Sequence, residues 1–127
     1  PPDGAALAAA PGSGAGGGAG AVVLALGGRV LTGPEALGEI ADLDRTIAAA
    51  DLVVTSCDDV DVETWGGPVV AHVVARANAA GRPVVVIART NRTSLAGQRE
   101  HGIEAVHAVG DGDITDGCLS FARSWFW

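Results

Sequence analysis

Three short apolar runs dominate the pattern of hydrophobic and polar positions along the chain. They cover residues Asp51–Thr55, Val84–Ala88 and Ala105–Val109, and valine and alanine supply most of their residues. A short apolar run that does not alternate with polar residues is typical of a strand buried on both faces of a parallel sheet. We therefore predict that these runs form three neighbouring parallel strands.

Stretches with helical periodicity separate the predicted strands. Residues Gly33–Ala50 carry apolar residues at helical spacing, and Asp42 and Asp44 are expected to divide the stretch into two short helices, one aspartate capping the second. Strands that alternate with helices predict right-handed crossovers. The expected fold class is α/β, a parallel sheet of about three to four strands flanked by helices, as in a Rossmann- or flavodoxin-like half-domain. Further helices are expected over Pro68–Ala80, over Ser94–His101 and after the capping residue Asp113.

The first part of the chain is rich in glycine and shows no strand pattern. Residues 1–10 are interpreted as a lead-in segment and residues 11–127 as a single α/β domain. Gly12, Gly14 and Gly17 satisfy the spacing GxGxxG, but a dinucleotide-binding turn must follow a buried strand, and none is visible here. The stretch is either a flexible linker or a glycine turn whose amides approach an anion at the start of a helix. The apolar run Ala21–Leu26 is more consistent with a helix than with a strand.

Polar residues follow the first predicted strand at the end where open parallel sheets bind ligands. We expect residues Ser56–Asp59 to form a loop there, with Thr55, Thr90 and Gly110 near the same edge of the sheet. One possibility is a Mg²⁺ site, because Mg²⁺ prefers oxygen ligands. The favoured alternative is a solvated loop in which Asp61 accepts backbone N–H groups ahead of the next helix. The four carboxylates of this segment are Asp58, Asp59, Asp61 and Glu63.

Cysteine and arginine side chains add two weaker candidates at the same edge. Cys57 directly follows a predicted strand, as a nucleophile could, but nothing in the spacing makes His72 or His107 its base. We therefore expect Cys57 to have no catalytic role. Arg89 and Arg92 could bind a phosphate through paired hydrogen bonds, or they could be surface residues without a function, and the sequence leaves both possibilities open.

The composition excludes several classes of function. The formal net charge of −7, with no lysine among the 127 residues, argues against nucleic acid and against anionic membranes as partners. The lack of lysine also excludes a Walker lysine and a Schiff-base lysine from these residues. Two cysteines are too few for a disulfide framework, so we expect a reduced, cytoplasmic protein. The absence of methionine predicts a piece or a processed form of a longer protein.

Several motifs, taken in order, resemble the C-terminal portion of the bacterial two-domain glycerate kinase family. The segment PGSGAGGGAG resembles the family's PGSGAAGGLG turn, and DLVVT followed by Asp, Thr and Gly resembles its DLVITGEG…D.QT..GK segment. The strand PVVVIA and the strand beginning Gly-Ile-Glu-Ala-Val resemble its closing elements. The resemblance covers roughly Pro11–Val109. It implies transfer of a phosphoryl group from ATP, with Mg²⁺, to D-glycerate, a small hydroxy acid.

Departures from the family pattern qualify what the resemblance implies. Cys57 stands where the family has Glu, and Pro68 stands where it has Lys, whereas Asp61, Thr64 and Gly67 match. The family's lysine-bearing phosphate loop lies upstream of this region. The resemblance therefore implies part of a larger two-domain parent, incomplete and inactive as this chain alone, with Asp61 the best catalytic candidate. The residues implied in substrate or phosphate binding are Gly14, Gly17, Gly18, Thr55, Ser56, Asp58, Asp61 and Thr64.

Two expectations about function and partners follow from this resemblance. The alternative to a kinase segment is a non-catalytic module of the same fold that binds a small molecule or another protein. A short parallel sheet has two edges, and exposed edges invite pairing with another strand. We therefore expect association with the missing N-terminal half, or with a second copy, through a sheet edge or through the aromatic end Trp125–Trp127.

Overall fold

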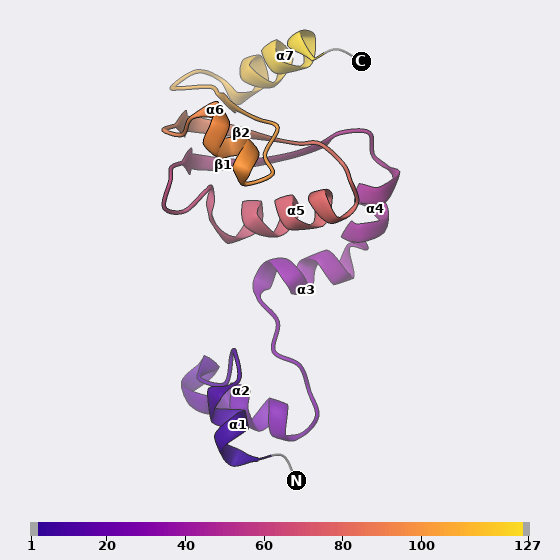
Figure 1. Cartoon of the computed structure of the whole chain (residues 1–127), viewed down its shortest axis with the longest axis vertical. Coiled ribbons are helices and arrows are strands. Elements are labelled where there is room, and N and C mark those ends of the chain that lie inside the picture. Colours follow the sequence, from indigo (N-terminus) through magenta and orange to yellow (C-terminus); the bar gives the residue numbers. More distant parts are fainter. Residues whose placement is uncertain (1–2, 126–127) are drawn as a thin grey trace. The chain divides into compact units, whose positions relative to one another are not determined.

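The chain divides into two compact units, which are described separately. A computed structural model describes residues 3–125, and its units are Pro1–Leu37 and Gly38–Trp127 (Figure 1). Of the aromatic end, Phe126 and Trp127 lie outside the described residues. The expected division into a lead-in segment and a single domain stays a prediction. Among residues 3–125, every helix is too short or too polar to cross a membrane.

The first unit is built around an ordered glycine turn. Helix α1 (Gly4–Ala9) begins at Asp3, whose carboxylate accepts the N–H of Ala5, so part of the expected lead-in segment is helical. Helix α2 spans Ala15–Ala25, and its glycines at positions 16–18 have φ angles of +59°, +68° and +101°, so its regular turns begin after them. A Cβ atom on Gly20 would lie 2.0 Å from the carbonyl oxygen of Gly12. This close approach requires glycine. The stretch therefore forms a turn followed by a helix over the predicted apolar run, and the approach of an anion to its amides stays a prediction.

The second unit contains a three-stranded parallel sheet in the order β1-β2-β3. Its strands are β1 (Val53–Val60), β2 (Val84–Asn91) and β3 (Ala105–Ala108). Val53 lies opposite Val84 and Val85 lies opposite Ala105, so all three predicted runs are neighbours in parallel register, as expected. The α/β class is confirmed.

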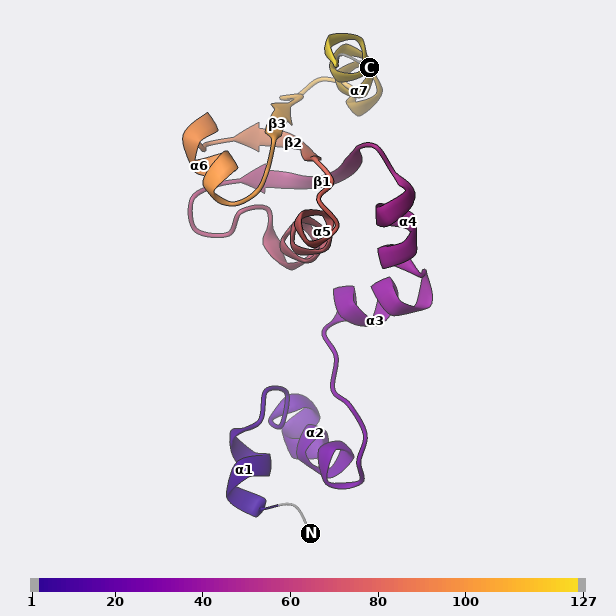
Figure 2. The same ribbon diagram turned by 45° about the vertical axis from the view of Figure 1, so that its right-hand side comes forward.

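Helices cover both faces of this sheet. Helix α5 (Gly67–Ala79) packs on β1 and β2 on one face, and α7 (Ile114–Ser124) packs beside β3 on the other (Figures 1 and 2). The predicted break in the first helical stretch gives α3 (Gly33–Ile40) and α4 (Leu43–Ala49), and α4 contacts α5. The short helix α6 (Leu95–Glu100) connects β2 to β3.

Local hydrogen bonds explain where these helices begin and end. Asp113 caps α7, as predicted, by accepting the N–H of Thr115 at 2.7 Å. Asp42 occupies the position before α4, but its carboxylate does not cap the helix and pairs with Nε of Arg45 at 2.5 Å instead. After α5, the N–H of Arg82 reaches the carbonyl of Ala77 across a left-handed Gly81, the usual glycine-terminated helix end.

Strand β2 has a core on each of its faces. All five residues of Val84–Ala88 are buried. Val84, Val86 and Ala88 contact the cluster under α5, which includes Val70 and Ile103. Val85 and Ile87 pack with Phe121 of α7 on the opposite face. Two-sided burial is therefore confirmed for β2.

Strand β1 differs from its prediction in two respects. β1 lies at the edge of the sheet because it pairs with β2 alone among the described residues. Val54 is 52% exposed, so one face of β1 is open, and the expected burial on both faces was wrong. The expected loop Ser56–Asp59 is part of β1, and β2 likewise continues past its predicted run through residues 89–91. Asp59 lies opposite Thr90 and its carboxylate accepts the Thr90 hydroxyl, while the completely buried Val60 ends the strand. Pairing with β2, which is distant in the sequence, thus makes the polar segment after Thr55 part of strand β1.

We predict that Val60→Ala lowers the free energy of unfolding by about 2 kcal/mol, since it removes two buried methyl groups and leaves a cavity. Urea unfolding followed by circular dichroism measures the change. Val54→Ala is the matched control, because it alters strand propensity in the same strand at an exposed position, and we expect a change of about 0.5 kcal/mol. Equal effects of the two substitutions would contradict the extension of β1 to Val60.

Candidate functional site

A cleft of about 320 Å³ lies beside the carboxyl-terminal parts of β1 and β2 and the turn after β3. Cys57, Asp58 and Arg89 line it from β1 and β2, and Gly110, Gly112 and Asp113 line it from the turn after β3. We call this the carboxyl-edge cleft. Its position is where open parallel sheets bind ligands. Ile87, Ala88, Val109 and Ile114 supply its apolar lining.

The charged groups of this cleft are an exposed ion pair and the carboxylate of Asp113. Nε of Arg89 lies 3.8 Å from a carboxylate oxygen of Asp58, and the two side chains are 57% and 88% exposed. An exposed pair at this distance contributes little to stability. The hydrogen bond from the Thr115 N–H, followed by that from its side chain, holds the pKa of Asp113 below its ordinary value, so this carboxylate is charged at neutral pH. The cleft thus offers one exposed guanidinium and two carboxylates.

Asp61 organises the turn that leads from β1 to α5. One of its carboxylate oxygens accepts the N–H of Glu63 at 2.9 Å, the N–H of Thr64 at 2.8 Å and the Thr64 hydroxyl at 3.0 Å. The N–H of Thr64, then that of Glu63, lower the pKa of Asp61 below its ordinary value of 3.8. The favoured interpretation of Asp61 as an acceptor of backbone N–H groups ahead of a helix is confirmed.

Cys57 packs under the same turn rather than facing a base. Its Sγ lies 3.4 Å from the carbonyl oxygen of Asp59, and a Cβ atom on Gly66 would lie 3.0 Å from it. Burial, followed by the nearby charges of Asp58 and Asp59, raises the pKa of the thiol, so it is protonated at neutral pH and a poor nucleophile. Cys57 and Cys118 are both unpaired.

The residues expected to bind substrate or phosphate do not gather in one place within the second unit. Asp58 lines the carboxyl-edge cleft, whereas Asp61 and Thr64 bond to each other in the following turn. Thr55 and Ser56 lie opposite Val86 and Ile87 inside the sheet, before the carboxyl edge. Gly14, Gly17 and Gly18 belong to the first unit. The roles of all eight residues in binding stay predictions.

The turn after β3 lines the cleft, but its residues were not predicted from the sequence as site residues. The signal was present, because Gly110, Gly112 and Asp113 follow the third apolar run and the rule for carboxyl ends applies to every strand of the sheet. Gly110 was expected near this edge, but only the segment after the first strand was treated as a candidate site.

The acidic residues do not assemble a site for Mg²⁺. Within residues 3–125, no group of three or more His, Cys, Asp or Glu side chains could hold a metal ion. One oxygen of Asp61 already accepts the donors of its turn, and one oxygen of Asp59 accepts the Thr90 hydroxyl. Nη2 of Arg92 also lies 3.8 Å from a carboxylate oxygen of Asp59. The described residues of this chain therefore do not fit a Mg²⁺ site of their own.

Comparisons with known proteins agree with this architecture. The family model described as the glycerate kinase family matches residues 3–122. The chain is 33% identical, over 108 residues, to uncharacterized proteins of Mycobacterium bovis and Mycobacterium tuberculosis, and these residues are 85% of this chain and 28% of each relative. The chain thus spans less than a third of the length of these relatives.

A solved structure supports the fold. A crystal structure described as "putative glycerate kinase 2" from Salmonella typhimurium LT2 aligns with 91% of this chain and 33% of that chain, at a TM-score of 0.56 and 24% identity. At this identity the likeness concerns the fold alone. The resemblance read from the sequence motifs is confirmed at the level of the family by the family match.

We predict that Asp61→Asn lowers the free energy of unfolding at pH 7. The difference in this free energy between the variant and the unsubstituted chain should become smaller in acid. A folded-state pKa below 3.8 means that the charged carboxylate stabilises the fold above its unfolded-state pKa, and that this contribution is lost as the pH falls through the folded-state pKa. Urea unfolding at pH 7 and at pH values below 3.8 measures the difference in free energy of unfolding. Asp58→Asn, at a side chain 88% exposed, is the control. A difference that does not depend on pH would contradict the turn described here.

Proposed function

The chain belongs to the glycerate kinase family, and we propose that it is a section of a protein that transfers a phosphoryl group from ATP to D-glycerate. The observation that carries this proposal is the family match, which runs through residues of both units. Because the chain spans less than a third of its relatives' length, the activity is proposed for the whole protein. This chain supplies part of the site.

The carboxyl-edge cleft suits the acceptor substrate in size and in chemistry. D-Glycerate is a small carboxylate with neighbouring hydroxyl groups, and the cleft of about 320 Å³ combines a guanidinium with carboxylate acceptors. The planar fork of Arg89 matches a carboxylate in a two-bond contact. Its contact with Asp58 is long and exposed, so exchanging that partner for the substrate carboxylate costs little. Asp58 is then free to accept a substrate hydroxyl.

Other residues of the chain have supporting roles in this proposal. Asp61 and Thr64 shape the turn beside the carboxyl edge. The glycine turn of the first unit, with Gly14, Gly17 and Gly18, offers backbone amides to an anion. ATP and Mg²⁺ are implied by the family alone, and we propose that the parent protein holds them largely with residues outside this chain, since phosphoryl transfer depends on cationic and metal clamps.

A non-catalytic module is the second candidate, and one observation favours it. The family's acidic residue is replaced by Cys57, whose pKa is raised by burial, and the neighbouring Asp61 is engaged by the turn. In this alternative the carboxyl-edge cleft still binds a small hydroxy acid, but no phosphoryl group is transferred.

We predict that this chain alone forms no ADP in response to D-glycerate, whereas the full-length parent protein does, in a coupled assay with ATP and Mg²⁺. In the parent, Arg89→Ala should raise the KM for D-glycerate by roughly 10- to 100-fold, since a hydrogen bond to a charged group is worth about 1.5–3 kcal/mol. Arg92→Ala is the matched control, because Arg92 contacts Asp59 and does not line the cleft. A parent protein that binds D-glycerate without forming ADP would favour the module.

The free edge of β1 generates a second prediction. Among the described residues β1 pairs with β2 only, and its outer face exposes Val54. We expect this chain to self-associate at micromolar concentration in light scattering, and Val54→Lys to shift it toward the monomer, since a lysine on an edge strand opposes strand pairing. A monomer with a cooperative melt would contradict the expected association.

A further inference from the structure

Trp65 is held in an unusual backbone conformation directly after the Asp61 turn. Its φ angle is +48°, and the next two residues, Gly66 and Gly67, have φ angles of +86° and +84°. Glycine adopts such angles freely, but a bulky side chain rarely does, and such strain persists where the surroundings fix the residue. Contacts made by the Trp65 side chain must therefore offset it.

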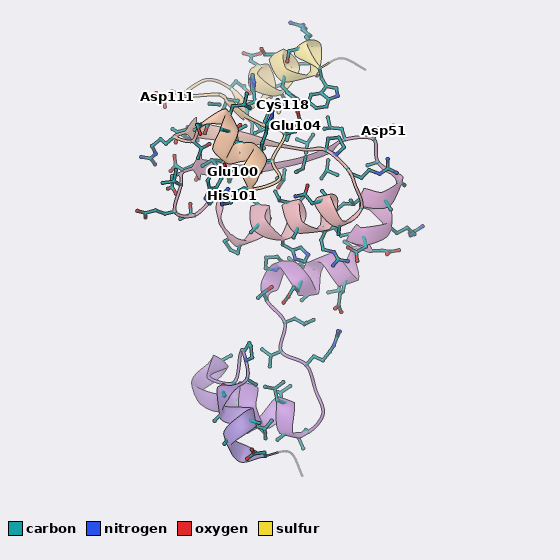
Figure 3. All side chains as sticks on the ribbon, in the orientation of Figure 1. Asp51, Glu100, His101, Glu104, Asp111 and Cys118 are labelled. Carbon is teal, nitrogen blue, oxygen red and sulfur yellow. The ribbon has the colours of Figure 1, made fainter. Side chains whose placement is uncertain are left out.

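The indole ring of Trp65 is clamped against helix α6. It stacks on the imidazole of His101, with ring centroids 3.6 Å apart and an interplanar angle of 14°. Figure 3 labels His101 at the end of α6, and its Nδ1 lies 3.0 Å from the carbonyl oxygen of Gly97, which fixes the imidazole plane. A Cβ atom on Gly97 would lie 3.0 Å from Cη2 of Trp65. Glycine inside a helix is unfavourable, and here it makes room for the ring.

The clamped ring is joined directly to the turn of the candidate site. The N–H of Trp65 donates to the carbonyl of Asp61 at 3.1 Å, and the carboxylate of Asp61 accepts the N–H groups of Glu63 and Thr64, two of the three residues between. The ring also packs against the core cluster under α5. One end of the turn is therefore anchored by β1 and the other by the stack on α6.

We propose that Trp65 is a positioning residue for the Asp61–Thr64 turn, and that His101 and Gly97 hold it in place. A ring fixed between α6 and the core keeps the backbone after Thr64 in its left-handed course, and this course presents two N–H groups to one oxygen of Asp61. That the turn serves a substrate rests on the proposed function. The clamp itself is a property of this chain without substrate.

The test compares three histidine variants of the 127-residue chain by NMR. His101→Ala removes the stack, His101→Phe keeps a flat ring, and His107→Ala is the matched control, since His107 contacts Phe121 on the other face of the sheet. The first readout is the hydrogen-exchange protection of the Glu63 and Thr64 amides. The second is the pKa of the Asp61 carboxyl group, which those amides lower.

His101→Ala should reduce protection of both amides several-fold and raise the pKa of Asp61 toward 3.8, while protection of the Val84–Ala88 amides stays unchanged. His101→Phe should restore both readouts. Gly97→Val, which keeps His101 but displaces the ring, should act like His101→Ala. Loss of protection throughout the chain, or equal effects of His101→Ala and His107→Ala, would overturn the proposal. All measurements exclude substrate, so a parent protein without kinase activity would refute the proposed function and leave this result standing.

Discussion

The burial of β2 on both faces is the constraint on which the second unit depends. Five consecutive residues, Val84–Ala88, are inaccessible to solvent, and each buried valine is worth roughly 1.5–3 kcal/mol. Such a strand is stable only when both faces are covered and both edges are paired. Helices α5 and α7 cover the faces, and β1 and β3 pair with the edges. Because side chains alternate along β2, Val84 and Val86 lie in one core and Val85 and Ile87 lie in the other, so the strand joins the two layers.

The site depends on the same strand because β2 does not end where its apolar residues end. Its polar extension pairs with that of β1, with Asp59 opposite Thr90, and the buried Val60 closes the pair. This extension moves the carboxyl edge several residues past the apolar runs. Asp58 and Arg89 consequently lie side by side at the rim of the cleft, and the turn that carries Asp61 starts only after Val60.

The sequence predicted those features that local chemistry determines. Continuous apolar runs marked the three strands, Asp113 marked the start of a helix, and Asp61 was recognised as an acceptor for a turn. Features set by distant partners could not be read in this way. Nothing near Val54 indicates that its strand lies at an edge, and nothing near Asp59 indicates that Thr90 will pair with it. The stack of Trp65 on His101 joins residues far apart in the chain, so no local pattern announces it.

The position of β1 at the edge of the sheet also determines which loops lie beside the Asp61 turn. In an open parallel sheet, a binding crevice forms where loops from neighbouring strands lie on either side of it. The described residues supply such loops around β2, and the carboxyl-edge cleft lies there. On the other side of β1 the described residues supply the Asp61 turn alone. The carboxylate of Asp61 fixes the backbone groups of this turn in place. The Trp65 clamp braces the end of the same turn, since the ring stacks on His101 at the end of α6 and packs against the core under α5.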